Sequence, residues 1–358
     1  MTVSMAKADL SRIDVVVPNL SARYSGVTST IIALVPEHMK RIAIAAVGRN
    51  LPERLPNVSL GAVLRGGFRP PRGRRARIWH ARRNIEMLTG LLLARVLRQP
   101  WKLVFTRAGQ RSTTAYTRFL ARRMDAVVAT SPEAAAVMRM PATVVMHGVD
   151  TDRFHPAADR AAAFAATGLP GRYGIGIFGR VRPQKGTDLF VEAMLRLLPE
   201  APDWTAVVIG LVQPEDRAFT DKLVRKVEEA GLATRIRFLG EQPVDTIPGW
   251  QRALSILVAP PRHEGFGLLP IEAMASGTPV VASRAGAHEA CMIDGETGVL
   301  VPAGDGAALT AAIGRMMALA PAEREAIGAA GRRHVEAGFS IAREAERLEA
   351  IYKRLLES

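Results

Sequence analysis

The sequence predicts an α/β protein built from two doubly wound domains in tandem. Short β-branched runs alternate with helical patterns along both halves of the chain, which is typical of parallel sheets covered by helices. The 358 residues exceed the size of one ordinary domain, and 48% of them are hydrophobic, enough to bury two cores. Between the halves, residues 147–172 carry turn residues and no strand pattern, so we place the domain boundary there.

In the first half, five apolar runs have the composition of buried strands. They are IDVVVP at 13–18, RIAIAAVG at 41–48, KLVFT at 102–106, AVVAT at 126–130 and TVVMH at 143–147. Helical patterns lie between them at 27–39, 78–98, 112–123 and 132–139. Ser131 and Pro132 provide an N-cap and a first-turn proline for the last of these helices.

The second half repeats this scheme. Its predicted strands are YGIGIFG at 173–179, TAVVIG at 205–210, RIRFLG at 235–240, LSILVAP at 254–260 and TPVVAS at 278–283. Its predicted helices are 186–198, 214–230, 268–276, 306–319, 322–336 and 341–356. We therefore expect an N-terminal domain at 1–150, a C-terminal domain at 151–340 and a terminal helix at 341–358. Ligand should bind in the cleft between the domains, at the carboxyl ends of their strands.

The excess of positive charge lies entirely in the first half of the chain. Residues 1–150 hold 24 Lys+Arg and 8 Asp+Glu, a balance of +16, whereas residues 151–358 hold 24 and 26, a balance of −2. This asymmetry predicts an anionic partner for the first half only. The single cysteine, Cys291, excludes a disulfide framework and fits a reducing cytoplasm. We also expect no signal peptide and no transmembrane helix.

A cationic loop follows the first predicted strand of the second half, in FGRVRPQKGTDLF. Gly179 ends the strand, Gly186 begins the next helix, and Arg180 and Lys185 lie in the loop between. Free backbone N–H groups at a helix N-terminus and two nearby cations favour a diphosphate. The spacing matches neither a P-loop nor a dinucleotide fingerprint, and the alternative is a solvated turn.

A second motif, HEGFGLLPIEAMASG, carries two carboxylates eight positions apart. Glu264 belongs to a glycine-containing loop after a strand, and Glu272 belongs to the helix that follows. Paired carboxylates suggest acid and base chemistry, but a loop position and a helix position need not face one another. The alternative is a surface glutamate in each case. A loop at the end of a strand is nevertheless where open α/β sheets bind ligand.

Together the two motifs resemble the retaining glycosyltransferases of family 4, which have the GT-B architecture of two Rossmann-like domains facing across a cleft. The resemblance extends over about 173–303 and includes HGVDTDRFHP at 147–156. It implies that Arg180 and Lys185 bind the diphosphate of a nucleotide sugar, that Glu272 accepts hydrogen bonds from the ribose, and that Glu264 holds the transferred sugar. It also implies that Gly179 and the backbone N–H groups of Phe266, Gly267 and Leu268 lie near the donor, and that no metal or other cofactor is required. The terminal helix at 341–358 is expected to pack back on the N-terminal domain, as in members of this family.

In the first half the resemblance is looser. Gly26, in YSGVTS, is similar to the family's N-terminal glycine loop, which implies that Gly26 belongs to the donor-binding residues and that the backbone here approaches the donor phosphate or the acceptor. The alternative is an ordinary helix start. Where many relatives have a histidine after the strand at 102–106, this sequence has Thr106-Arg107, followed by Gln110 and Arg111. Arginine binds carboxylates bidentately, so we expect Arg107, Gln110 and Arg111 to hold an acidic acceptor. His147 and His263 are not assigned a catalytic role.

Residues 65–83 contain eight arginines. They form either a solvated basic helix face or, with Phe68, Trp79 and the following MLTGLLLARVL, an interfacial helix on anionic lipid. Neither a recognition fold nor stacking aromatics indicate nucleic-acid binding.

The pattern most resembles bacterial lipopolysaccharide-core mannosyltransferases. This implies retaining transfer of mannose from GDP-mannose to Kdo, an acidic inner-core sugar linked to lipid A, by a cytoplasmic enzyme peripheral on the inner membrane. The alternatives are a UDP-sugar donor with another lipid-linked or glycan acceptor, a GT-B epimerase or phosphorylase, and a non-enzymatic binding module.

Overall fold

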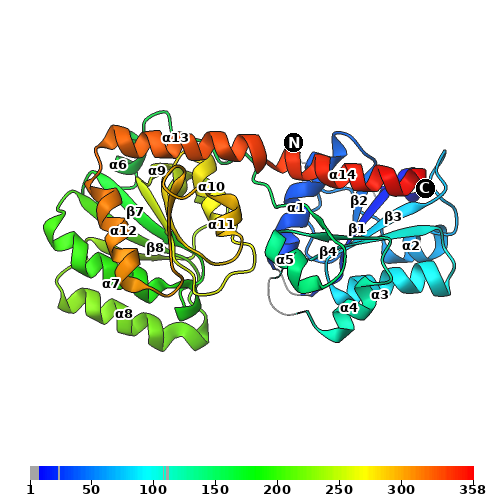
Figure 1. Ribbon diagram of the computed structural model, residues 1–358, viewed down its shortest axis with the longest axis horizontal. Helices are drawn as coiled ribbons and strands as arrows, with labels where there is room; N and C mark the ends of the chain where they lie inside the picture. The colour runs from blue at the N-terminus through cyan, green and yellow to red at the C-terminus, as the bar shows by residue number, and fades with distance from the viewer. Residues whose placement is uncertain (1–7, 23–24, 108, 110–112) are drawn as a thin grey trace. The chain divides into compact units, whose positions relative to one another are not determined.

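Two compact units make up the chain, and each contains one six-stranded parallel sheet with helices packed on it (Figure 1). The computed structural model describes all residues except 1–7, 23–24, 108 and 110–112. Unit 1 comprises Met1–His147 and Ile341–Ser358, and unit 2 comprises Gly148–Ser340. The predicted α/β class with two doubly wound sheets is confirmed.

The sheet of unit 1 has the strand order β2-β1-β3-β4-β5-β6. Its strands are β1 (Val15–Asn19), β2 (Ile44–Gly48), β3 (Arg77–Ala81), β4 (Trp101–Arg107), β5 (Ala126–Ala129) and β6 (Thr143–Val144). Its helices are α1 (Gly26–Met39), α2 (Leu60–Gly66), α3 (Asn84–Leu91), α4 (Ala115–Ala121), α5 (Pro132–Met138) and α14 (Ile341–Glu357), and a π-helical segment, η2 (Leu92–Val96), extends α3.

Two apolar clusters cover the two faces of this sheet. On one face, α14 contributes Leu348 and Ile351 to a core with Ile78 and Val104. On the other face, Trp79 packs with residues of α3 and α4. Alternation of side chains along β3 explains why Ile78 and Trp79 belong to different clusters.

The predicted helix at 78–98 is wrong over its first turn, because residues 77–81 form strand β3. Arg77 and Trp79 are both 0% exposed. The Arg77 guanidinium donates to the carbonyls of Ile13 and Leu10, each at 2.8 Å, so a cation is accommodated inside the sheet. Trp79 therefore takes no part in an interfacial helix. Only the β3 part of the arginine-rich segment enters the core, and the arginines before it are exposed.

Unit 2 repeats the architecture with the strand order β12-β11-β10-β7-β8-β9. Its strands are β7 (Tyr173–Phe178), β8 (Trp204–Ile209), β9 (Ile236–Gly240), β10 (Ile256–Ala259), β11 (Val280–Ser283) and β12 (Gly298–Val301). Its helices are α6 (Arg160–Ala165), α7 (Thr187–Leu197), α8 (Arg217–Glu229), α9 (Ile247–Ala253), α10 (Leu269–Ala275), α11 (His288–Cys291), α12 (Gly306–Ala318) and α13 (Pro321–Gly338).

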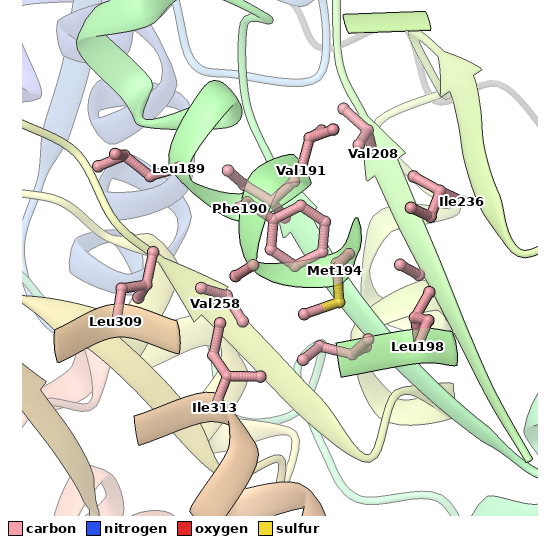
Figure 2. Close-up of a cluster of buried hydrophobic side chains, with 14 of the residues drawn as sticks. Leu189, Phe190, Val191, Met194, Leu198, Val208, Ile236, Val258, Leu309 and Ile313 are labelled. Atoms are coloured by element: carbon pink, nitrogen blue, oxygen red, sulfur yellow. The ribbon is translucent and has the colours of Figure 1, made fainter. Parts of the chain in front are cut away.

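The core of unit 2 lies where α7 and α12 pack on the sheet (Figure 2). Phe190 and Met194 of α7 are fully buried beside Val258 of β10 and Ile313 of α12. This packing fixes the start of α7 against the end of β7 and so positions the loop between them. In the described part of the chain, no helix is both long and apolar enough to span a membrane.

Candidate functional site

The two motifs of the second half leave neighbouring strands at the point where the chain reverses direction across the sheet of unit 2. From β7 the chain proceeds through β8 and β9 on one side, then returns to β10 on the other side of β7. Open α/β sheets bind ligand outside the carboxyl ends of strands at such a switch point. The loop 179–186 follows β7 and the loop 260–268 follows β10, so the sheet topology brings the two motifs together.

Several contacts hold these two loops to each other. The Arg262 backbone N–H donates to the Gln184 carbonyl at 2.9 Å, and the Gln184 amide donates to the His263 carbonyl at 3.1 Å. Arg262 also forms two parallel hydrogen bonds of 2.8 Å with the Asp188 carboxylate in the first turn of α7. That paired geometry raises the pKa of Arg262 further and fixes both loops before any ligand arrives.

Lys185 and Glu264 meet between the loops as an ion pair, with the Lys185 ammonium donating to Glu264 Oε2. The other oxygen, Glu264 Oε1, accepts from the Gly265 N–H at 2.8 Å. Burial acts to raise the pKa of Glu264, but the Lys185 charge, its hydrogen bond and the Gly265 N–H hold that pKa below its ordinary value. Glu264 is therefore an ionised, oriented carboxylate at neutral pH and is unsuited to act as a general acid.

Three glycines permit this close packing. Gly186 has φ +72° and lies against the Pro260 carbonyl, where an added Cβ would be 2.1 Å from the oxygen. Gly267 (φ +87°) and Gly286 (φ +62°) border Glu264, and a Cβ on either would come within about 3 Å of its side chain. Only glycine combines the left-handed backbone with this absence of a side chain.

His288 lies beneath the loop and was not predicted. It is 1% exposed, and its Nδ1 donates to the Ser283 carbonyl at 2.9 Å, which leaves Nε2 as the unprotonated nitrogen of the neutral ring. That nitrogen would be 2.3 Å from a Cβ at Gly267. Burial lowers the pKa of His288, although the Ser283 carbonyl and the Glu264 charge oppose the effect. A neutral His288 therefore supports the Gly267 turn beside Glu264.

Glu272 lies on α10, and its carboxylate has few partners. Gln251 of α9 donates to Glu272 Oε2 at a long 3.3 Å. Burial raises the pKa of Glu272, while the Gln251 hydrogen bond and the more distant Arg153 charge oppose the rise. The carboxylate thus retains unused acceptor capacity, as a residue that binds hydroxyl groups of a ligand would.

The remaining predicted donor residues belong to the same pair of loops. Arg180 is exposed and has no ion pair with a described residue, so its charge is available to an anion. Gly179 has φ +121°, which suits a chain that turns sharply out of β7. Phe266 is buried, its carbonyl accepting from the Ala287 N–H at 2.8 Å, and Leu268 precedes the first residue of α10. The roles assigned to these residues remain predictions.

In unit 1, Gly26 begins α1, and open space surrounds the position that its Cβ would occupy. Arg107 ends β4, and its Nε donates to the Gly109 carbonyl at 3.1 Å. Burial lowers the pKa of Arg107. Gln110 and Arg111 lie outside the described residues. Over the described ranges, no three His, Cys, Asp or Glu side chains gather in a way that could hold a metal ion, and a donor site without metal remains a prediction.

Sequence reasoning missed His288 and the Arg262–Asp188 pair. Arg262 and Asp188 are 74 positions apart, so no local pattern links them. The glycine two positions before it, in RAGAHEA, is the one local signal that could have drawn attention to His288.

Comparisons with known proteins agree with this geometry. The profile of the family "Glycosyl transferases group 1" matches residues 172–318. The chain is 52% identical to the lipopolysaccharide core biosynthesis mannosyltransferase LpcC of Rhizobium leguminosarum bv. viciae, over 97% of this chain and 98% of that protein. It is 46% identical to the lipopolysaccharide core biosynthesis mannosyltransferase LpsB of Rhizobium meliloti (strain 1021), over 97% and 99%.

Solved structures are similar as well. The C-terminal domain of a group 1 glycosyl transferase, LpcC, from Francisella tularensis is 41% identical with a TM-score of 0.52, over 54% of this chain and all of that one. HepE from Anabaena, in complex with UDP, has a TM-score of 0.81 at 17% identity, over 96% of this chain and 100% of that chain. The latter likeness concerns the fold alone.

Proposed function

The chain belongs to the group 1 glycosyl transferases and is a glycosyltransferase of GT-B fold, and from this premise we propose that it transfers mannose from GDP-mannose to an inner-core sugar of lipopolysaccharide. The observation that supports the donor site is the pair of joined loops after β7 and β10. Lys185 and Glu264 form an ion pair between these loops, and the loop that carries Lys185 also carries the exposed Arg180. The choice of mannose and of the lipopolysaccharide core is supported by the two relatives that match nearly the whole chain.

Arg180 and Lys185 bind the donor diphosphate in this proposal, and their charges stabilise the negative charge that develops as it leaves. Glu264 orients the hydroxyls of the transferred sugar, and Glu272 accepts from the ribose. The acceptor hydroxyl attacks the anomeric carbon on the face from which the diphosphate departs. The new bond joins the acceptor oxygen to that carbon, the carbon–phosphate-oxygen bond breaks, and the acceptor proton passes to the departing diphosphate. The configuration is retained, and no enzyme nucleophile takes part.

Two measurements test the donor and the reaction. Binding of the correct nucleotide raises Tm by mass action, so GDP should shift Tm whereas UDP and ADP should not. Incubation with GDP-mannose and Kdo-lipid A should then give one α-linked mannose, read by mass spectrometry and NMR. A Tm shift with UDP alone would support the alternative of a UDP-sugar donor, and a β-linked product would contradict retention.

The acceptor is proposed to be acidic, namely Kdo on lipid A, and to be held by Arg107, Gln110 and Arg111. Replacing Arg107 or Arg111 by alanine should raise KM for the acceptor far more than KM for the donor. Equal effects on both constants would remove these residues from the acceptor site.

Membrane association is proposed for a different part of unit 1 from the arginine-rich segment. Along α3 and η2, the residues Ile85, Leu88, Leu92 and Val96 are 52%, 46%, 45% and 69% exposed and recur at helical spacing. On the adjacent α4, Tyr116 and Phe119 are 50% and 52% exposed. We call these six residues the apolar face. Exposed Arg95, Arg122 and Arg123 lie on the same elements or next to them, a combination that suits anionic lipid.

Vesicle sedimentation tests this assignment. Wild-type protein should bind vesicles of phosphatidylcholine with phosphatidylglycerol, less so in high salt, and Leu88→Asp with Phe119→Asp should abolish binding. Val244→Asp is the matched control, because Val244 of unit 2 is also 68% exposed. Equal loss in the control, or unchanged binding of the double variant, would contradict a role for the apolar face.

A further inference from the structure

Unit 1 has its own switch point, between β1 and β3. The chain leaves β1 for β2 on one side, and β3 lies on the other side of β1. By the same rule that locates the donor loops of unit 2, a ligand of unit 1 should bind at the carboxyl ends of these two strands. Asn19 ends β1, while Arg82 and Arg83 directly follow β3.

The two arginines differ in their surroundings, and the Arg83 guanidinium is hydrogen-bonded to groups of the fold. Its guanidinium donates to Asn19 Oδ1 and Glu86 Oε1, both at 2.7 Å, and to Ser25 Oγ at 2.8 Å. Glu86 is completely buried, and Arg83 is its ion-pair partner. Arg83 thus joins the end of β1, the start of α1 and the start of α3.

Arg82 is held at its backbone, but its guanidinium is unsatisfied. The Arg82 backbone N–H donates to Glu86 Oε2 at 2.7 Å, which fixes where the side chain begins. Its Nε and Nη1 atoms are buried and have no hydrogen-bond partner. No ion pair joins Arg82 to a residue in the described part of unit 1.

The charged groups near Arg82 have other partners. Glu344 and Glu349, whose charges act on Tyr352 together with that of Arg82, lie against His147 and His38. His80 donates to and accepts from two hydroxyls, Tyr352 Oη at 2.5 Å and Thr106 Oγ1 at 2.6 Å. Burial, followed by the Arg82 charge itself, lowers the pKa of His80 well below its ordinary value, so His80 is neutral. The closest carboxylate by sequence, Glu86, is already paired with Arg83.

A second unsatisfied group lies at the same edge. Ala81 of β3 pairs with Phe105 of β4, so Arg82 is level with Thr106. Thr130 follows β5, the next strand, and its N–H continues the ladder by donating to the Arg107 carbonyl at 3.0 Å. Thr130 is 1% exposed, and its Oγ1 has no hydrogen-bond partner.

We propose that Arg82 and Thr130 form an oxyanion site at the carboxyl edge of the unit 1 sheet, and that it receives the carboxylate of the acidic acceptor sugar. Buried N–H and O–H donors without partners are costly, and a planar carboxylate satisfies a guanidinium with two parallel hydrogen bonds. Thr130 supplies a neutral hydroxyl to the same anion or to an adjacent sugar hydroxyl. The inference rests on the acidic acceptor of the proposed function and adds the cation that selects it.

Paired ligands test the site directly. The methyl glycoside of Kdo and the corresponding carboxamide differ only in the charge of one group, and calorimetry in the presence of GDP measures the Kd of each. Loss of a charge-assisted pair corresponds to about 10- to 100-fold in Kd. Wild-type protein should bind the acid that much more tightly than the amide, and Arg82→Gln should bind both with the weak affinity of the amide.

Matched variants separate binding from folding. Arg54→Gln removes the same charge from an exposed loop position and should leave the acid-to-amide ratio unchanged. Arg82→Gln removes only an unsatisfied group and should keep or raise Tm, whereas Arg83→Gln breaks the buried pair with Glu86 and should lower Tm.

The proposal is overturned if the wild type does not distinguish acid from amide, or if Arg82→Gln keeps the wild-type ratio. The proposed function fails separately: a wild type that prefers the acid yet transfers no mannose to Kdo-lipid A retains the Arg82 site and loses the reaction. A wild type that transfers mannose but does not prefer the acid over the amide retains the proposed function and rules out the Arg82 site.

Discussion

Replacing Glu272 by glutamine should change donor affinity and apo stability in opposite directions. The Glu272 carboxylate has no ion pair among the described residues and accepts one long hydrogen bond, from Gln251 at 3.3 Å. Burial raises its pKa, so its ionised form is less favourable in the folded protein than in the unfolded chain. Glutamine has nearly the same shape and no charge, so this cost disappears, as does the charge that would hold the ribose hydroxyls.

The size of each effect follows from the hydrogen bonds at stake. Losing the charge of a hydrogen-bonded carboxylate weakens binding by about 2 kcal/mol, or roughly 30-fold in Kd for GDP. At a GDP concentration of about 100 times the wild-type Kd, GDP stabilises wild type by about 2.7 kcal/mol and the variant by about 0.9 kcal/mol. Without nucleotide, Glu272→Gln should gain up to about 1 kcal/mol, or about 2–4 °C in Tm for a unit of this size.

Scanning calorimetry with and without GDP provides the assay. The variant should melt above the wild type when free and below it when GDP is present. The size of the effect without nucleotide should also depend on pH. The ionised Glu272 destabilises the fold at pH values above its raised pKa, so the advantage of the variant should shrink as pH falls through that value. If the free variant melts below the wild type, Glu272 is a structural residue and the reasoning is wrong.

Three further predictions concern other parts of the chain. Lys185→Met and Glu264→Gln should each lower kcat by about 10²–10³-fold in initial-rate assays. Because the pKa of Glu264 is held below its ordinary value, wild-type activity should persist as pH falls through that ordinary value and decline only as pH falls through the lowered pKa. Glu264→Gln should lack this decline at acidic pH. Gly267→Ala should lower Tm more than Gly295→Ala. Both glycines have positive φ (+87° and +83°), but only a Cβ at position 267 would lie 2.3 Å from His288 Nε2. Equal losses of Tm would show that the His288 contact is unimportant. Tyr352→Phe should cost about 1–3 kcal/mol in urea unfolding, because His80 Nδ1 loses its buried partner at 2.5 Å; a similar loss for Tyr116→Phe, a change at a half-exposed residue, would refute that explanation.

Regular apolar patterns allowed most of the fold to be predicted. The runs predicted as strands at 102–106, 126–130 and 173–179 are β4, β5 and β7. Fully buried parallel strands need continuous apolar residues, and such runs are visible in one sequence without further information. The predicted cationic loop likewise follows β7 and precedes α7, because a strand, a glycine and a helix pattern stand next to each other in the sequence.

Strand β3 shows where that reasoning stops. Its residues, RIWHA, include an arginine and a histidine, and the segment was predicted to be helical. Both polar side chains are buried because distant groups satisfy them: carbonyls of residues 10 and 13 for Arg77, and Tyr352 with Thr106 for His80. A prediction from local polarity does not include hydrogen-bond partners that lie 26 to 272 positions away in the sequence.

The residues available for chemistry can be read from the sequence: two cations after one strand, two glutamates after another, and an excess of arginine in the first half. How these residues are used depends on the three-dimensional packing. In unit 2, Lys185 pairs with Glu264, Arg180 is exposed, and His288 lies under Gly267. In unit 1, Arg83 forms hydrogen bonds within the fold, whereas two buried nitrogens of Arg82 have no hydrogen-bond partner. The physical reason is that a side chain's charge and hydrogen-bonding capacity are local properties, whereas whether a partner satisfies them depends on which strands lie side by side.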